Sequence, residues 1–186
     1  MKKLSILSAG ITITLAFIFI NFTGCQDDQT SSVLTPGSAA STKSAKTQSI
    51  YPNDRFYTES HEWIKVGEDS TALVGITEYS AAVLGVAEGS SEEEDIFITL
   101  PRKKKIAKIT GTESNTKVYM PVSGVIDGYN PAAKSNPSLI TSYPYSLGWI
   151  AKLSKISYSD LALLMNAGEY ESYVRQQPNY NSLFKK

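Results

Sequence analysis

The feature that most constrains the fold of this chain is the apolar run LSILSAGITITLAFIFINF, residues 4–22. A segment of this composition does not fold as part of a globular domain, so the beginning of the chain is separate from the domain that follows. Lys2 and Lys3 precede the run, which itself carries no charge. Basic residues ahead of an uncharged apolar stretch are typical of a segment that directs export. We therefore expect residues 1–24 to be a signal peptide.

The motif FTGC ends the apolar segment at Cys25, the single cysteine of the chain. A small residue before a cysteine in this context resembles a bacterial lipobox, in which the thiol takes a diacylglycerol and the chain is cut before the cysteine. Two or three acyl chains, palmitate among them, give stable membrane anchoring where one chain is marginal. We expect a lipoprotein anchored through Cys25 on the exported side of a bacterial membrane. The alternative is an uncleaved transmembrane anchor, because the run approaches spanning length.

Residues 25–54 are rich in serine and threonine and include Pro36 and Gly37. Such a composition cannot bury a core, so we expect a disordered tether. The predicted organisation is a signal peptide at 1–24, the tether at 25–54, a folded domain at 55–177 and a loose tail at 178–186.

Composition excludes several classes of function. The chain has 18 basic and 18 acidic residues, so no charge excess points to nucleic acid. One cysteine and one histidine cannot build a disulfide framework or a structural zinc site, and we expect no metal. The 11 tyrosines are many for this length and could mark a binding face. The remaining partners are the membrane, through the lipid anchor, and a protein whose identity the sequence does not give.

The folded part is predicted to be mostly β, with short helices. The stretches HEWIKV and TALVGIT predict a hairpin of two strands, and EYSAAVLG after them predicts a helix capped by Thr77 and ended by Gly85. Later segments are predicted as an acidic loop at 86–95, a buried strand at 96–101, a basic turn at 102–105, two strands around TESN, a strand at 147–153 and helical spacing over 157–177, with Gly168 as a possible interruption. The acidic and basic runs are either a partner-binding dipole or two solvated loops.

Six of these stretches, in the same order, resemble the H protein of the glycine cleavage system. They are HEWIKV, ALVGITEYSAAVLG, IFITLP, YMPVSGVI, NPSLITSYPYSLGWIAKL and SDLALLMNAGEYESYV. The resemblance implies a lipoyl/biotinyl-like fold, a flattened β-barrel or two-sheet sandwich with a carboxy-terminal helix. It also implies a carrier rather than an enzyme, with lipoate held through an amide on a lysine at the tip of a hairpin.

The lysine that this resemblance requires is missing from its place. The family places it eight residues before the proline of the PVSG stretch, and that position holds Glu113. A carboxylate cannot form the amide, so we predict no lipoate. An alternative register makes Lys117 the lipoyl-lysine, but it removes residues from the following strand and changes which side chains face inward. A stretch that the family has between Pro101 and Ile106 is also absent.

His61 and Glu62 are candidate cleft residues, because the resemblance implies that the glutamate lines the cleft that receives the loaded arm. Without an arm, the pair would simply hold the first strand. The sequence therefore predicts an exported, non-lipoylated domain of this family that serves as a binding or structural module and is not an enzyme. The first alternative is a true lipoyl carrier of the aminomethyl group through Lys117. A weaker alternative is an enzyme that uses His61.

Overall fold

The computed structural model describes residues 49–184. The predicted signal peptide, the predicted lipid attachment site Cys25 and most of the predicted tether lie outside these residues. Within the part that is described, none of the helices combines the length and the apolar character that a membrane crossing requires.

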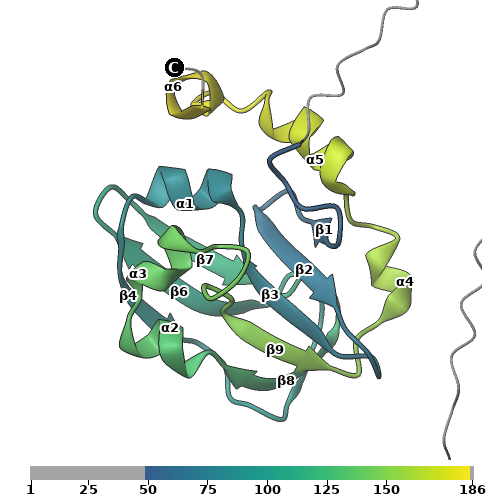
Figure 1. Ribbon diagram of the computed structural model, residues 1–186. Coiled ribbons are helices and arrows are strands. Elements are labelled where there is room, and N and C mark those ends of the chain that lie inside the picture. Colours follow the sequence, from purple (N-terminus) through teal and green to yellow (C-terminus); the bar gives the residue numbers. More distant parts are fainter. Residues whose placement is uncertain (1–48, 185–186) are drawn as a thin grey trace, which may run out of the picture. The chain divides into compact units, whose positions relative to one another are not determined.

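Two antiparallel sheets form the body of the domain (Figure 1). The larger has the order β1-β2-β3-β9-β8-β5 and the smaller the order β4-β6-β7. The strands are β1 (Phe56–Tyr57), β2 (Glu62–Val66), β3 (Ala72–Ile76), β4 (Ala87–Glu92), β5 (Thr99–Leu100), β6 (Lys105–Gly111), β7 (Asn115–Tyr119), β8 (Gly124–Tyr129) and β9 (Ala151–Ser154). The predicted mostly-β, two-sheet fold is confirmed, and the sheets of residues 49–184 do not close into a barrel.

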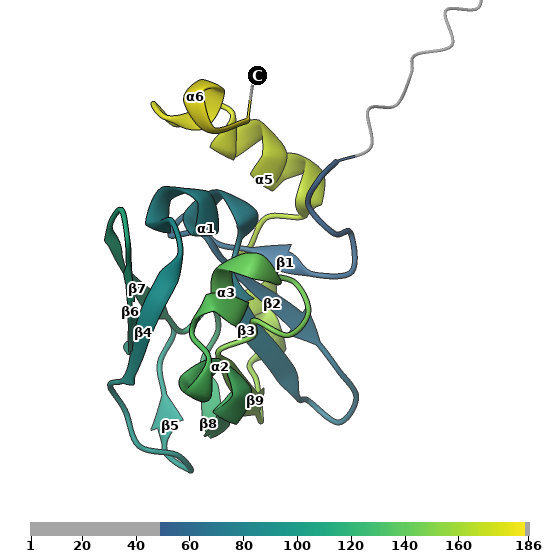
Figure 2. The same ribbon diagram turned by 60° about the vertical axis from the view of Figure 1, so that its left-hand side comes forward.

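Short helices connect and cover the sheets. They are α1 (Glu78–Leu84), α2 (Pro131–Ser135), α3 (Ser138–Ser142), α4 (Tyr158–Leu161), α5 (Ala167–Val174) and α6 (Tyr180–Phe184). The turned view in Figure 2 places the two sheets on opposite sides of the interior, with α1 at one end of the smaller sheet. Between the sheets lies the main core, which includes Ile64, Val74, Ile109, Val118 and Ile126, all fully buried.

The first hairpin and the helix after it form as the sequence predicts. β2 and β3 pair from Glu62 with Ile76 to Val66 with Ala72. The Thr77 hydroxyl accepts from the Ser80 backbone N–H and so caps α1, which removes one of the unpaired donors of its first turn. Gly85 ends the helix.

Two predictions between 86 and 101 are wrong. The predicted acidic loop contains β4, a polar edge strand. Its hydrogen-bonded pairing with β6, and not an apolar face, makes it a strand. The predicted buried strand at 96–101 is reduced to β5, because the backbone turns at Phe97, whose φ is 64° and whose side chain is 72% exposed. The predicted strand at 147–153 likewise begins only at Ala151.

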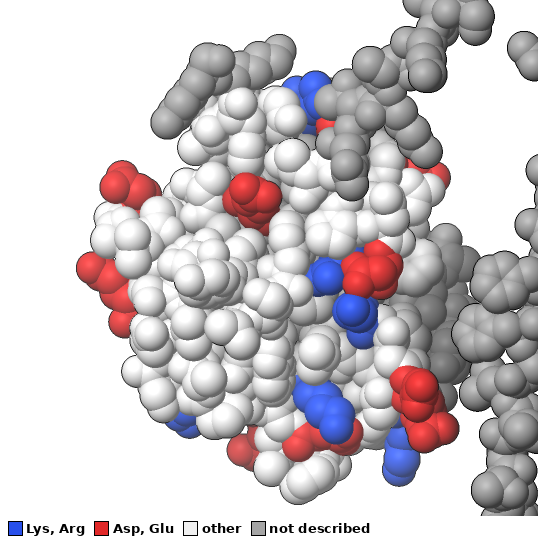
Figure 3. Space-filling model, viewed as in Figure 1, with Lys and Arg blue, Asp and Glu red and all other residues white. Residues whose placement is uncertain are grey.

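The acidic and basic runs lie side by side instead of forming a dipole. Lys104 Nζ lies 2.8 Å from a Glu94 carboxylate oxygen, and Lys105 Nζ lies 3.0 Å from one of Glu93. On the face shown in Figure 3, positive and negative side chains are interspersed rather than gathered into one basic area. These two pairs neutralise part of the charge of each run.

The ends of the domain are more ordered than predicted. Tyr51, inside the predicted tether, is 1% exposed and packs edge-on against Tyr170. The predicted tail contains α6, whose Tyr180 is buried. Five of the tyrosines thus belong to a second, aromatic core cluster rather than to a binding face; they are Tyr51, Tyr57, Tyr79, Tyr170 and Tyr180. The helical region 157–177 divides at Asn166, which caps α5, and not at Gly168.

Candidate functional site

The tip of the β6–β7 hairpin is a tight turn that presents Glu113 to solvent. Thr110 pairs with Asn115, and the Gly111 N–H donates to the Ser114 carbonyl over 2.9 Å to close the turn. Thr112 and Glu113 are both exposed on it. The residue counted back from the PVSG stretch therefore stands on the turn itself.

This turn is fixed against the end of α1. The Glu113 N–H donates to the Leu84 carbonyl over 3.1 Å, and the Ser114 hydroxyl donates to the Val83 carbonyl over 2.9 Å. Carbonyls in the last turn of a helix lack partners within the helix, so the hairpin supplies their donors. The turn is thus held by contacts that do not depend on the Glu113 side chain.

Lys117 lies within β7, not on the turn. It pairs with Lys108 of β6, and the pairs Ile109–Thr116 and Thr110–Asn115 stand between it and the turn. Its side chain is exposed. The hairpin therefore keeps the register in which Glu113 occupies the tip, while Lys117 extends from the flank of the smaller sheet.

Glu62 connects the two sheets. Its carboxylate accepts from the Tyr119 N–H of β7 over 3.0 Å and from the Ser60 hydroxyl over 2.7 Å, and it also accepts from the Thr58 hydroxyl. The residue is 1% exposed. Burial raises the pKa of this carboxyl, while the hydrogen bonds act in the opposite direction. The structure thus gives Glu62 a place between the sheets, with its oxygens already engaged.

His61 faces the aromatic cluster. Its Nδ1 lies 2.8 Å from the Tyr170 hydroxyl, which also lies 2.8 Å from the Thr77 hydroxyl. Burial lowers the pKa of His61 to about 4, so its ring is neutral at physiological pH. Tyr170 and Thr77 are committed to core packing and to capping α1, so this arrangement does not activate a nucleophile at an open surface.

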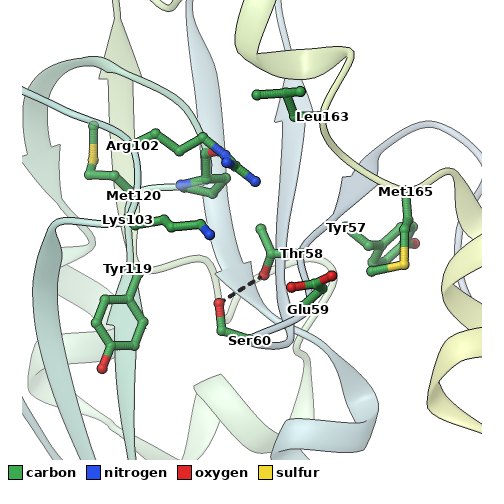
Figure 4. Close-up of a pocket in the computed structure, with 11 residues that line it drawn as sticks. Tyr57, Thr58, Glu59, Ser60, Arg102, Lys103, Tyr119, Met120, Leu163 and Met165 are labelled. Atoms are coloured by element: carbon green, nitrogen blue, oxygen red, sulfur yellow. Dashed lines mark hydrogen bonds between the residues drawn. The ribbon is translucent and has the colours of Figure 1, made fainter. Parts of the chain in front are cut away.

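A pocket of about 580 Å³ lies beside the loop between β1 and β2, which carries Thr58, Glu59 and Ser60 (Figure 4). Four segments line it, at 57–60, 102–103, 119–121 and 163 with 165. Local sequence patterns do not indicate this pocket, because its segments come from distant parts of the chain. Its only local signal was the basic turn. Elsewhere in residues 49–184, no group of three or more His, Cys, Asp or Glu side chains is placed to hold a metal ion.

The two antiparallel sheets and the short helices match the lipoyl-type fold. The chain belongs to the glycine cleavage H-protein family, whose model matches residues 55–177. It is 32% identical to the glycine cleavage system H protein of Thermus thermophilus over 133 residues, which cover 68% of this chain and 97% of that protein. It is 33% identical to the H protein of Halothermothrix orenii over 132 residues, covering 67% and 96%.

The fold agrees with a solved structure of the same family. The H protein from Mycobacterium marinum matches with a TM-score of 0.57 and 27% identity, covering 66% of this chain and 97% of that chain. The family is one of lipoyl carriers rather than enzymes, so the prediction that this chain is not an enzyme is confirmed. The weaker alternative, an enzyme built on His61, has no support from this family or from the surroundings of the ring.

Proposed function

We propose that this chain is an H-protein-family domain that carries no lipoate and acts as a binding or structural module anchored in a bacterial membrane through Cys25. The observation that carries the proposal is the residue at the hairpin tip. Lipoyl attachment needs a nucleophilic amine on an exposed turn, and the turn holds the carboxylate of Glu113. The residues present at the tip therefore do not fit the cofactor.

The alternative carrier needs Lys117 as the attachment point. Lys117 is exposed, which is compatible with modification. However, it lies in a strand, with two residue pairs between it and the turn. Strand pairing holds its backbone in the extended form, whereas the family's lysine stands on a tight turn. The geometry thus favours the non-lipoylated reading.

A loading assay separates the two functions. The purified domain is mixed with the glycine decarboxylase of a glycine cleavage system and labelled glycine, beside a lipoylated H protein as positive control. We expect label on the control and none on this domain. Label on this domain that disappears in Lys117→Gln would establish the carrier function and overturn the proposal.

The anchoring part of the proposal is tested separately. Full-length protein and a Cys25→Ser variant are expressed in a bacterium, and membrane and soluble fractions are compared after labelling with palmitate. We expect label and membrane association for the wild type and loss of label in the variant. Equal labelling of the two proteins, or no labelling of either, contradicts attachment at Cys25.

A further inference from the structure

The 580 Å³ pocket beside the loop between β1 and β2 has the size of a small-molecule site. Figure 4 shows Arg102 and Lys103 extending from one wall toward the loop that carries Thr58 and Ser60, with Leu163 and Met165 on other sides. The pocket does not include the hairpin tip. It is therefore distinct from the turn on which Glu113 stands.

Hydrogen bonds to backbone carbonyls fix the Arg102 guanidinium and the backbone of Lys103. Arg102 Nε donates to the Pro121 carbonyl over 3.2 Å, which fixes the plane of the guanidinium. Lys103 has a φ of 67°, uncommon for a lysine, and its N–H donates to the Met120 carbonyl over 2.8 Å. Among residues 49–184, neither side chain forms an ion pair within 4.0 Å. The Arg102 guanidinium is thus positioned without an ion-pair partner, and the exposed Lys103 side chain extends from a fixed backbone.

Two acids stand near these cations, and neither neutralises them through a direct pair. Glu59 lines the pocket from the opposite loop and is itself exposed. Asp160 lies near Arg102, but its carboxylate accepts the Ser123 N–H over 2.7 Å. The lining itself therefore holds two cations and one acid, and the negative charge of Asp160 lies outside the lining, close to Arg102.

The rest of the lining includes apolar surface that water contacts. Leu163 is 63% exposed and Met165 is half-buried, and both line the pocket. Covering such surface is favourable by about 25 cal/mol per Å². A ligand that matches this pocket combines a planar anion with an apolar body, because guanidinium binds carboxylates through paired hydrogen bonds.

We propose that the pocket formed by Arg102, Lys103, Leu163 and Met165 binds a small organic carboxylate with an apolar body. The carboxylate lies against the Arg102 guanidinium and the Lys103 ammonium, and the apolar body covers Leu163 and Met165. The inference deepens the proposed role as a binding module by naming the class of ligand.

Calorimetric titration of the domain with phenylacetate, beside the neutral phenylacetamide, tests the proposal. We expect phenylacetate to bind at least about tenfold more tightly than the amide, since hydrogen bonds to charged groups are the strong ones. Arg102→Gln and Lys103→Gln should each remove about tenfold of phenylacetate affinity. Lys117→Gln removes a positive charge outside the pocket and should leave the affinity unchanged.

Two results would overturn the inference. One is equal binding of acid and amide, or no binding of either, by a folded domain. The other is an equal loss of affinity in Lys117→Gln, which would show that net charge alone attracts the anion. Either failure leaves the proposed function standing, because the state of the hairpin tip is measured separately by loading and by mass.

Discussion

The Glu113 N–H donates to the Leu84 carbonyl oxygen over 3.1 Å, so the tip of the β6–β7 hairpin ends on the last turn of α1. This contact joins a turn of the smaller sheet to α1, the helix that comes directly after β3 of the larger sheet in the chain. It fixes the position from which the family's attachment residue would extend. The side chain found there is a carboxylate, and the local backbone does not require it.

Replacement of Gly85 by alanine is expected to displace the hairpin tip. Gly85 has a φ of 77°, and a Cβ built there would lie 2.3 Å from Thr112 Oγ1 and 2.7 Å from Glu113 Cγ. We expect a loss of about 2 kcal/mol in the free energy of unfolding, from the left-handed backbone and the clash together. Faster hydrogen exchange of the Glu113 amide should accompany it. Gly128→Ala, where a Cβ meets nothing within 4 Å, serves as the control. Equal losses in the two variants would contradict this role of Gly85.

Glu62→Ala is expected to weaken the link between the sheets. It leaves the Tyr119 N–H and the Thr58 and Ser60 hydroxyls without their acceptor. Removing the acceptor of the buried Thr58 hydroxyl and of the partly buried Tyr119 N–H costs about 3 kcal/mol, and Glu62→Gln, which keeps an acceptor oxygen, should cost less. Denaturant unfolding measures both, with the exposed Glu59→Ala as control at about 0.5 kcal/mol or less. A Glu62→Ala variant as stable as this control would refute the link.

The buried His61 predicts a loss of stability in mild acid. Its pKa falls from 6.5 to about 4 on folding, so between these values the unfolded chain binds a proton that the folded chain does not. Its contribution is complete above pH 6.5 and is lost as the pH falls toward 4, by about 2 kcal/mol after allowance for partial exposure. The raised pKa of Glu62 acts in the opposite sense, because the folded state then takes up a proton first.

The difference between wild type and His61→Asn isolates this contribution. Asparagine tolerates the left-handed φ of 70° at this position and does not titrate. We expect the stability of the wild type to fall more steeply than that of the variant between pH 6.5 and 4, whatever their levels at neutral pH. Parallel pH profiles would show that His61 titrates normally in the folded state.

Local patterns predicted the elements whose determinants lie close together in the chain. The β2–β3 hairpin follows from alternation in HEWIKV and TALVGIT, and α1 follows from Thr77 and Gly85 at its ends. The register counted from the PVSG stretch put Glu113 at the tip of the next hairpin, and Glu113 lies on that turn. In each case the signal needs only a few neighbouring residues.

Features that depend on distant partners could not be found in this way. β4 is polar along most of its length, and only its pairing with β6 makes it a strand. The local composition predicts that Tyr51 belongs to a polar tether, yet contact with Tyr170 buries it. The pocket around Arg102 and Lys103 gathers segments from four places in the sequence, so a basic turn was its only visible part.

The state of the hairpin tip is measured most directly by the intact mass of the domain, produced in a host that lipoylates a co-expressed H protein. We predict an unmodified mass for the wild type and for Lys117→Gln. We also predict a lipoyl adduct on Glu113→Lys, in which the amine returns to the tip. A lipoyl or octanoyl adduct on the wild-type hairpin, mapped by peptide fragmentation to Lys117 or another lysine, would contradict the account.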